Sequence, residues 1–296
     1  MRGAAPAIHQ FVPTLAPRDA IGAHTLAVQD LLRELGWRSE VYAWEVKPGL
    51  EGRALPYRRF ARPWRRPRTW CLYQASIASV IADFLRERPE PKLLNYHNIT
   101  PAELVGDWDP AVGEAVVFGR QQLARLAPAT ELAIAVSSFN EADLVSTGYR
   151  RTTVVPPLVD LDALACEPDA VMLDRLEAAR AGGGPDWLFV GRLSPHKAQH
   201  HVVAALAAYR RAYDGRARLR LVGGAASPSY EVALRRYVAY LGLEEAVELT
   251  GSVTPGELAA LYAAADVFVC CSEHEGFCVP LLEALHAGVP VVAYAA

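Results

Sequence analysis

The stretch SEHEGFCVPLLEALHAGVPVV, residues 272–292, places two glutamates, Glu275 and Glu283, around the start of a short apolar segment with helical character. Pro280 suits the first turn of a helix, and Gly288 suits the position just past its last residue. Glu275 is therefore expected in the loop before the helix and Glu283 in its first turn or so, with both carboxylates facing one cleft. The stretch thus predicts a strand-to-helix connection, which is where open α/β sheets bind their ligands.

The residues from 186 to 296 alternate between apolar runs and amphipathic segments about every 20 residues. The apolar runs are nearly continuous, which is typical of parallel strands covered by helices on both faces. Thr254, Pro255 and Glu257 come close to a capping box and mark the start of one helix. This half of the chain is therefore predicted to be a parallel α/β domain. Its strands are expected at 186–193, 217–224, 246–253, 266–272 and 290–295, and its helices at 196–213, 229–243, 254–265 and 279–287.

The first half of the chain repeats this alternation less regularly. A segment rich in alanine and aspartate follows it and ends in a run of three glycines, a composition typical of a hinge. The sequence therefore predicts an α/β protein with an N-terminal domain at 1–155, a hinge at 156–185 and a C-terminal domain at 186–296, both domains being doubly wound and Rossmann-like. In the N-terminal domain, strands are expected at 7–13, 39–44, 92–98, 131–138 and 152–160, helices at 20–36, 111–127 and 139–148, and a strand end with a helix at 72–88.

The composition limits the partners and the environment of the protein. The net charge is only −3 over 296 residues, so the chain as a whole does not indicate a nucleic-acid partner. The five cysteines are scattered without a disulfide or zinc spacing, which favours reduced thiols in a cytosolic protein. No apolar run approaches the ~20 residues of a membrane helix, and the N-terminus is a poor signal peptide. A cytoplasmic protein is expected, and peripheral membrane contact stays open.

The stretch PYRRFARPWRRPRTW, residues 56–70, departs from the alternating pattern. It contains six arginines and three prolines and shows no hydrophobic period. It can be a solvated loop, or a basic and aromatic surface that faces an anionic acceptor or membrane phosphates. The sequence does not decide between these two interpretations.

Several common nucleotide-binding and hydrolase motifs are missing from the sequence. There is no G-x-G-x-x-G after a predicted strand and no G-x-x-x-x-G-K-[ST], which disfavours a nicotinamide enzyme and a P-loop ATPase. The lack of G-x-S-x-G disfavours an α/β-hydrolase. His196 and His200 have the spacing of metal ligands on a helix but lack the glutamate of H-E-x-x-H, so a solvated helix face is the favoured interpretation.

Arg192 and Lys197 lie where the strand at 186–193 leads into a helix. A guanidinium can chelate two phosphate oxygens, an ammonium adds a point charge, and N–H groups at a helix start complete the site. The pair is therefore a candidate diphosphate site, although two solvated loop charges would leave the same pattern. Gly22 follows the first predicted strand and lets the chain turn close to a ligand, with an ordinary turn glycine as the alternative.

The chemistry expected of Glu275 and Glu283 favours sugar binding over acid catalysis. A carboxylate near the positive end of a helix stays ionised and is therefore a poor general acid. It is a good acceptor for vicinal hydroxyls, as the acidic residue that binds ribose in dinucleotide folds illustrates. One capping and one solvated glutamate would be the structural alternative.

The segment VGRLSPHK, residues 190–197, followed by EHEGFCVPLLEALHAGVPVV, residues 273–292, strongly resembles the retaining glycosyltransferases of family 4. The Glu-x7-Glu motif of that family matches Glu275 and Glu283, and YHNIT at 96–100 resembles its N-domain histidine loop. The resemblance implies the GT-B fold, in which two Rossmann-like domains face a cleft. It also implies a nucleotide-diphospho-sugar donor and a hydroxyl acceptor.

The resemblance implies roles for individual residues, and it implies no cofactor and no metal. Arg192 and Lys197 would hold the diphosphate, and Glu283 would hold the ribose. Glu275 would bind hydroxyls of the donor sugar. His97, at a strand's end, would reach the sugar or the acceptor, with a core or capping histidine as the alternative. The residues implied in donor binding are Gly22, Arg192, Lys197, Glu275, Gly276, Phe277 and Glu283, and those implied in catalysis are His97, Glu275, Arg192 and Lys197.

The predicted function is transfer of a sugar, with retention of anomeric configuration, to a hydroxyl of a glycan, a lipid or a small molecule. In the family the chain continues past the strand at 290–295 and returns to the N-terminal domain. The C-terminal domain is therefore expected to be incomplete, and the chain to be less soluble and less active than an extended version. A non-catalytic sugar-nucleotide-binding remnant is one alternative. A glycoside hydrolase that uses both glutamates is another.

Overall fold

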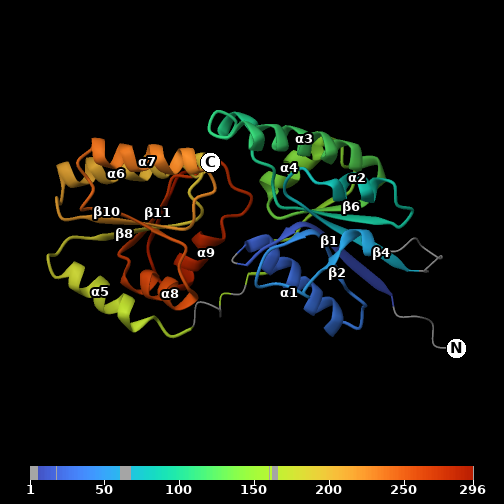
Figure 1. Cartoon of the computed structure of the whole chain (residues 1–296), viewed down its shortest axis with the longest axis horizontal. Coiled ribbons are helices and arrows are strands. Elements are labelled where there is room, and N and C mark those ends of the chain that lie inside the picture. The colour runs from blue at the N-terminus through green and yellow to red at the C-terminus, as the bar shows by residue number, and fades with distance from the viewer. Residues whose placement is uncertain (1–5, 18, 61–67, 160, 162–165, 296) are drawn as a thin grey trace. The chain divides into compact units, whose positions relative to one another are not determined.

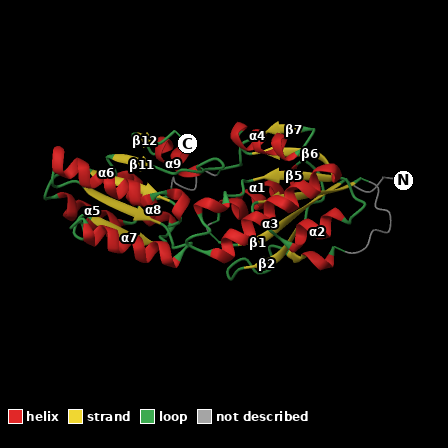
Figure 2. Cartoon of the chain, turned by 90° about the horizontal axis from the view of Figure 1, so that it is seen from above, coloured by secondary structure: helices red, strands yellow, loops and turns green. Residues whose placement is uncertain are grey.

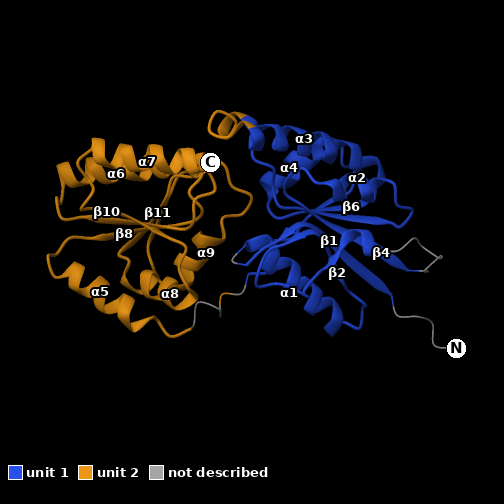
Figure 3. Cartoon of the chain, in the orientation of Figure 1, with its two compact units in different colours: residues 1–102, 111–159 blue, residues 103–110, 160–296 orange. Residues whose placement is uncertain are grey.

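The chain forms two compact units, which Figure 3 colours separately. A computed structural model describes residues 6–17, 19–60, 68–159, 161 and 166–295. Unit 1 consists of Met1–Ala102 and Ala111–Val159, and unit 2 of Glu103–Pro110 and Asp160–Ala296.

Unit 1 is built on a sheet of seven parallel strands in the order β3-β2-β1-β4-β5-β6-β7. Helix α1 covers one face of this sheet, and α2, α3 and α4 cover the other (Figure 1). The strands are β1 (Ala7–Leu15), β2 (Val41–Val46), β3 (Leu55–Pro56), β4 (Thr69–Ala75), β5 (Lys92–Tyr96), β6 (Thr130–Ala135) and β7 (Thr152–Val154). The α-helices are α1 (Ala20–Glu34), α2 (Val80–Arg86), α3 (Pro110–Leu126) and α4 (Ser138–Thr147), and short 3₁₀ turns are η1 (Tyr57–Arg59), η2 (Ala102–Leu104) and η3 (Ala127–Ala129).

Unit 2 is built on five parallel strands in the order β10-β9-β8-β11-β12. Helices α6 and α7 lie on one face and α5 and α8 on the other (Figures 1 and 2). The prediction of parallel, helix-covered sheets is thus confirmed for both units. The strands are β8 (Asp186–Val190), β9 (Arg218–Val222), β10 (Val247–Gly251), β11 (Val267–Cys270) and β12 (Val291–Ala293). The helices are α5 (Ala170–Arg180), η5 (Pro195–Lys197), α6 (Gln199–Ala212), α7 (Pro228–Tyr240), α8 (Pro255–Ala264) and α9 (Val279–His286).

The division into units differs from the hinge expected at 156–185. Helix α5 lies inside that range and packs on α8, so it is part of unit 2. The segment Glu103–Pro110 also belongs to unit 2, where the Trp108 carbonyl accepts a 2.7 Å hydrogen bond from Ser229 Oγ. Composition alone could not show either packing contact.

The helix ends in unit 2 follow the predicted signals. Thr254 Oγ1 accepts the N–H of Glu257, and the Glu257 carboxylate accepts the N–H of Thr254, which completes the predicted capping box. Pro280 occupies the first turn of α9, and Gly288 follows its C-cap with a φ of 73°. These short-range signals are reliable because each satisfies backbone groups that the helix itself leaves unpaired.

A buried carboxylate ties β8 to β9. Asp186 is 2% exposed and accepts hydrogen bonds from Arg218 at 2.9 Å and from Arg220 at 2.6 Å. Burial by itself would raise the pKa of Asp186, but these two hydrogen bonds outweigh burial and lower it. The strand that leads to Arg192 is therefore anchored at its amino end by a buried ionic network.

The basic stretch at 56–70 is only partly visible in this fold. Residues 61–67 lie outside the described residues, so both interpretations, a solvated loop and a basic surface that faces an anionic partner, stay predictions. Arg58 and Arg59, in η1, are exposed. Among the described residues, no helix combines the length and the apolar character needed to cross a membrane.

Candidate functional site

The order of strands reverses once in each sheet, and doubly wound folds bind ligands beyond the carboxyl ends of the strands at that reversal. In unit 2 the reversal falls between β8 and β11. Arg192 and Lys197 follow β8, and Glu275 follows β11. The structure therefore brings these three predicted residues to one edge of the sheet, where Lys197 Nζ lies 2.6 Å from Glu275 Oε2.

Two glycines set the path of the chain into this edge. Gly191 follows β8 with a φ of 153°, and Gly223 follows β9 with a φ of 137°. A Cβ on Gly223 would lie 2.2 Å from the carbonyl oxygen of Gly191, so the two loops touch backbone to backbone. Any residue larger than glycine at 223 would therefore push against the backbone of Gly191, which directly precedes Arg192.

The segment after β8 is electropositive. Arg192 is exposed, Lys197 is half-buried, and His196 lies between them in η5. Burial, followed by the charges of Lys197 and Arg192, lowers the pKa of His196 to about 3. His196 is therefore neutral, and the positive charge of this segment comes from Arg192 and Lys197.

The predicted solvated helix face at His196 and His200 is wrong for His196. Helix α6 begins only at Gln199, so the two histidines do not share a helix. His196 Nδ1 lies 3.0 Å from Ser194 Oγ, and His200 Nδ1 lies 3.0 Å from the hydroxyl of Tyr230. The Nδ1 atom of each histidine thus lies at hydrogen-bond distance from a neighbouring hydroxyl.

The Lys197–Glu275 ion pair is the central contact of this edge. Its side chains are 22% and 20% exposed, so the pair is partly shielded from water without being sealed. Such a contact can exchange partners, with the ammonium moving to a phosphate and the carboxylate to hydroxyls. Gly276 and Phe277 lie half-buried in the same loop, between Glu275 and α9.

Glu283 occupies a different position from the one predicted. Helix α9 starts at Val279, so Glu283 is its fifth residue and lies past the first turn. The hydroxyl of Tyr262, in α8, donates a 2.8 Å hydrogen bond to Glu283 Oε2. Burial raises the pKa of Glu283, and this hydrogen bond offsets only part of the rise. The helix end, a turn away, therefore does not lower the pKa of this carboxylate, because burial dominates.

In unit 1 the strand order reverses between β1 and β4. Gly22 follows β1 and lies in the first turn of α1, inside the range predicted as a helix. Its N–H donates a 2.9 Å hydrogen bond to Asp19 Oδ2, which caps the helix. A Cβ there would lie 3.1 Å from the carbonyl oxygen of Ala16, so the glycine allows α1 to start close to the strand.

His97 follows β5 and ends a chain of buried side-chain hydrogen bonds. Gln10 Nε2 donates to the Thr25 carbonyl at 2.8 Å, Gln74 Nε2 donates to Gln10 Oε1 at 2.8 Å, and Gln74 Oε1 lies 2.7 Å from His97 Nε2. The Thr25 carbonyl oxygen can only accept a hydrogen bond, so it fixes the orientation of the Gln10 amide. Gln10 Oε1 then accepts from Gln74 Nε2, which fixes the orientation of the Gln74 amide. Gln74 must then accept at His97, which places the imidazole proton on Nε2 and leaves the lone pair on Nδ1.

His24 packs edge-on against His97, with ring centroids 5.3 Å apart. Its Nδ1 accepts the N–H of Leu158 at 2.9 Å, and its Nε2 faces the side-chain amide of Asn95 at 2.8 Å. Burial lowers the pKa of His24 to about 4 and, with a smaller contribution from His24, that of His97 to about 3. Both rings are therefore neutral near pH 7.

The hydrogen bonds of Gln10 and Gln74 lead to a testable prediction about the tautomer of His97. Gln74→Leu removes the acceptor for His97 Nε2–H and leaves Gln10 without its donor, so we expect a loss of about 1–3 kcal/mol of stability and a mixture of His97 tautomers. Gln74→Glu keeps the acceptor for His97 but also removes the donor to Gln10, so it separates the two contacts and should retain the His97 tautomer. Nitrogen-15 NMR of the ring distinguishes the tautomers, and a wild-type His97 protonated on Nδ1 would contradict the assignment.

Tyr262, Gln10 and Gln74 contact the predicted site residues but were not themselves predicted. The two glutamines carry a usable signal, because each is a fully buried polar residue inside an otherwise apolar strand. Tyr262 carries only a weak one, an aromatic hydroxyl on an alanine-rich helix. Pairing it with Glu283 requires the packing of α8 against the start of α9.

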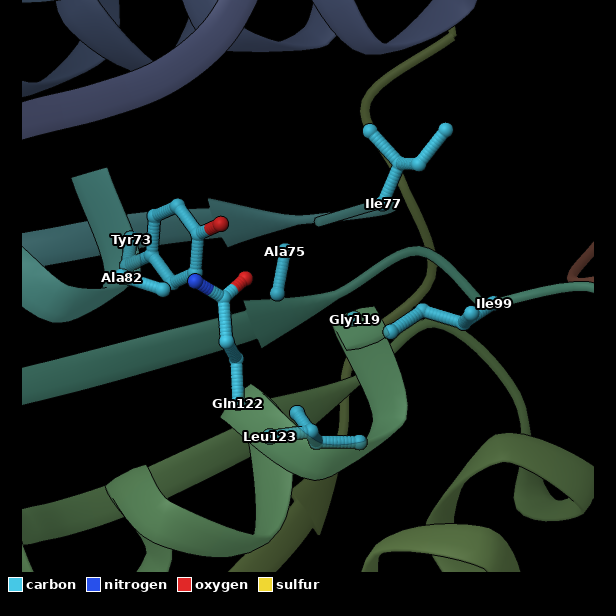
Figure 4. A pocket seen from close by; sticks show the side chains of 8 residues that line it. All are labelled: Tyr73, Ala75, Ile77, Ala82, Ile99, Gly119, Gln122 and Leu123. Atoms are coloured by element: carbon cyan, nitrogen blue, oxygen red, sulfur yellow. The ribbon is translucent and has the colours of Figure 1, made fainter. Parts of the chain in front are cut away.

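Figure 4 shows a hollow in unit 1 that holds none of the predicted site residues. At its wall, the Gln122 amide already bonds the N–H of Ser79 at 2.9 Å and its carbonyl at 3.0 Å. The polar groups of this hollow therefore serve the fold. Its lining residues are Tyr73, Ala75, Ile77, Ala82, Ile99, Gly119, Gln122 and Leu123.

The part of the chain that matches a known protein family lies in unit 2. Residues 174–296 match the family model described as "Glycosyl transferases group 1". A GDP-mannose-dependent alpha-(1-6)-phosphatidylinositol monomannoside mannosyltransferase of Mycobacterium tuberculosis is 34% identical over 183 residues, 59% of this chain and 46% of that protein. A D-inositol 3-phosphate glycosyltransferase of Nocardia farcinica is 35% identical over 154 residues, 51% of this chain and 34% of that protein. The chain spans less than half the length of these relatives.

Solved structures share the fold over nearly the whole chain. Anabaena Alr3699/HepE, solved in complex with UDP-glucose, has a TM-score of 0.69 and 20% identity over 98% of this chain and 80% of its own. WaaG, a glycosyltransferase involved in lipopolysaccharide biosynthesis, has a TM-score of 0.66 and 14% identity over 97% of this chain and 81% of its own. Residues 174–296 thus match the group 1 glycosyltransferases, and the chain as a whole shares the GT-B fold of these solved structures.

Proposed function

We propose that the chain transfers a sugar from a nucleoside-diphospho-sugar to a hydroxyl acceptor, with retention of anomeric configuration. The observation that carries the proposal is the meeting of Lys197 and Glu275 beyond the β8–β11 reversal, inside the segment that matches the family model. One side chain suits a diphosphate and the other suits sugar hydroxyls. The relatives named above are sugar-transfer proteins, which supports this reaction type.

In the proposed reaction the donor breaks the Lys197–Glu275 pair. The ammonium of Lys197 moves to the diphosphate, joined by the exposed guanidinium of Arg192, and both stabilise the charge that develops as the sugar–phosphate bond breaks. The freed Glu275 carboxylate accepts hydroxyls of the donor sugar. The departing phosphate takes the proton of the acceptor, and neither a metal nor a cofactor takes part.

His97 contributes a hydrogen bond rather than a proton transfer. A ring with a pKa of about 3 is too weak a base to hold a proton near pH 7. Its Nδ1 lone pair, left open by the glutamine chain, accepts a hydroxyl of the sugar or of the acceptor. Gly276 and Phe277 complete the contacts to the donor, and Gly22 allows the close approach of α1.

Donor and acceptor classes follow from the named relatives. GDP-mannose is the first donor to test, because the relative from M. tuberculosis is named as GDP-mannose-dependent, and UDP-glucose is the second. A phosphatidylinositol mannoside or an inositol phosphate is the first acceptor, and a lipid acceptor would bring the chain to a membrane surface. The described cysteines are free thiols, in keeping with a cytoplasmic location.

A panel of nucleotide sugars tests the proposal by thermal shift followed by product analysis. Stabilisation by one donor, with release of its nucleoside diphosphate when an acceptor is added, is the expected result. Binding without product would instead support a sugar-nucleotide-binding remnant. Glu283, with its raised pKa, and the ion-paired Glu275 also resemble the acid and the ionised carboxylate of a glycoside hydrolase. Sugar release from glycans without any nucleotide sugar would support that alternative.

Glu283 is proposed to bind the ribose of the donor. Glu283→Gln keeps the shape of the side chain but removes its charge, so we expect binding of the ribonucleoside diphosphate to weaken by about 1.5 kcal/mol. The matching 2′,3′-dideoxy compound should lose much less, because it lacks the hydroxyls. Calorimetry of both ligands makes the comparison, with Tyr262→Phe as a control that frees the carboxylate. Equal losses for the two ligands would assign Glu283 to the fold.

A further inference from the structure

Two cysteines border the loop that carries Glu275. Cys270 is the last residue of β11 and is 5% exposed, and Cys278 is the N-cap of α9 and is half-buried. The two Sγ atoms and a Glu275 carboxylate oxygen all lie within 4.8 Å of one another. The loop from 271 to 277 therefore has a thiol at each end and the proposed sugar-binding carboxylate between them.

The surroundings of the two thiols favour a reactive Cys270. The sulfur of Cys278 lies within 4.8 Å of that of Cys270, and Ser272 Oγ lies 3.3 Å from the sulfur of Cys270. Interaction with Cys278, followed by that with Ser272, lowers the pKa of Cys270, and interaction with Cys270, followed by burial, raises the pKa of Cys278. A thiolate beside a second thiol is the arrangement that reacts with a small oxidant and is then resolved.

A metal ion fits this cluster less well than a disulfide does. Two thiols and a carboxylate could ligate a soft divalent cation. The Glu275 carboxylate, however, is already 2.6 Å from the ammonium of Lys197. A metal ion would have to displace that ammonium from the carboxylate and would still lie close to its positive charge. A disulfide needs only the two sulfur atoms, which already lie within 4.8 Å of each other.

We propose that Cys270 and Cys278 form a reversible disulfide on reaction with a hydroperoxide, and that this disulfide closes the donor site by fixing the loop that carries Glu275. The second half of the inference rests on the proposed function, in which the Lys197–Glu275 pair must open for the donor. A bond across the loop holds Glu275 in its ion-paired position.

The chemistry balances with the hydroperoxide as the only oxidant. The Cys270 thiolate attacks the peroxide, an S–O bond forms, the O–O bond breaks, and the alcohol or water leaves after taking a proton. Cys270 is then a sulfenic acid, oxidised by two electrons. The Cys278 sulfur attacks it, the S–S bond forms, the S–O bond breaks and water leaves. A dithiol reductant reverses the reaction by thiol–disulfide exchange.

The test treats the full chain with hydrogen peroxide and then with dithiothreitol. Mass spectrometry should show the loss of two hydrogen atoms and a peptide that links Cys270 to Cys278, both reversed by the reductant. Cys271→Ser, which removes the neighbouring half-buried thiol, is the matched control and should behave like the wild type. Cys278→Gly removes the resolving thiol at a position with a φ of 64°, which glycine adopts freely, so this variant is expected to fold.

The affinity of the reduced and oxidised chains for GDP and UDP separates the two halves of the inference. We expect the affinity for these nucleotides to fall at least tenfold on oxidation and to return on reduction. The Cys278→Gly variant should show no such loss of affinity. A chain that forms no Cys270–Cys278 link, or that instead binds Zn²⁺ through these thiols and resists oxidation, would overturn the disulfide. A disulfide that forms without changing a measurable nucleotide affinity would overturn its link to the donor site. A chain that binds no nucleotide even when reduced would overturn that link together with the proposed function, and the disulfide would stand.

Discussion

Gly223→Ala is expected to destabilise unit 2 by about 3 kcal/mol, because the new Cβ would meet backbone atoms that have little room to move. That carbon would lie 2.2 Å from the carbonyl oxygen and 2.7 Å from the carbonyl carbon of Gly191. The φ of 137° at Gly223 adds strain for any L-residue. Since Gly191 directly precedes Arg192, whatever movement relieves the clash also displaces the proposed diphosphate site.

Hydrogen exchange of the β8 and β9 amides measures this effect within the intact chain. Gly182→Ala is the matched control, because a Cβ at Gly182 would meet no atom within 4 Å and its φ is not left-handed. That change should alter stability by no more than about 0.5 kcal/mol. Equal protection in the two variants would show that the loops after β8 and β9 separate easily, and that Gly223 does not position Arg192.

Lys197→Ala is expected to weaken binding of the nucleoside diphosphate by about 1.5–3 kcal/mol, the usual contribution of a charge-assisted hydrogen bond. The ammonium lies at the β8–β11 reversal and, apart from Glu275, has room to meet an anion. Calorimetry with GDP and UDP measures the loss. Arg211→Ala removes an exposed cation from the last turn of α6 and controls for the change in net charge.

Glu275→Gln separates the two halves of the ion pair. It releases Lys197, so affinity for the nucleoside diphosphate should be unchanged or higher, while affinity for the intact nucleotide sugar and turnover should fall. If Lys197→Ala leaves diphosphate affinity at the wild-type value, Lys197 has no place in the donor site. If Glu275→Gln lowers diphosphate and nucleotide-sugar affinity equally, Glu275 acts through Lys197 and not on the sugar.

Short-range signals in the sequence predicted the elements well. The capping box at Thr254 and the proline and glycine around α9 depend on residues a few positions apart, and the structure confirms them. Nearly continuous apolar runs correctly predicted parallel strands, because a sheet covered by helices on both faces buries mainly apolar side chains on both. The resemblance of two segments to family 4 added the GT-B fold, which the strand pattern alone does not specify.

Long-range packing accounts for what the sequence did not reveal. The pKa of Glu283 depends on burial and on Tyr262, 21 positions earlier, so the helix-dipole argument gave the wrong direction. The tautomer of His97 depends on Gln74 and Gln10, on two other strands. Contacts of this kind arise from strand order and helix packing, which periodicity cannot supply.

The most direct test of the account is a transfer assay with GDP-mannose and UDP-glucose as donors and a mixed pool of phosphatidylinositol mannosides, inositol phosphates and oligosaccharides as acceptors. Mass spectrometry follows the acceptors, and NMR reads the anomeric configuration of any product. The account predicts one acceptor that gains one sugar with retained configuration, an equal amount of nucleoside diphosphate, and loss of both in Lys197→Ala. No binding of any nucleotide sugar, together with sugar release from the oligosaccharides in the absence of donor, would contradict it.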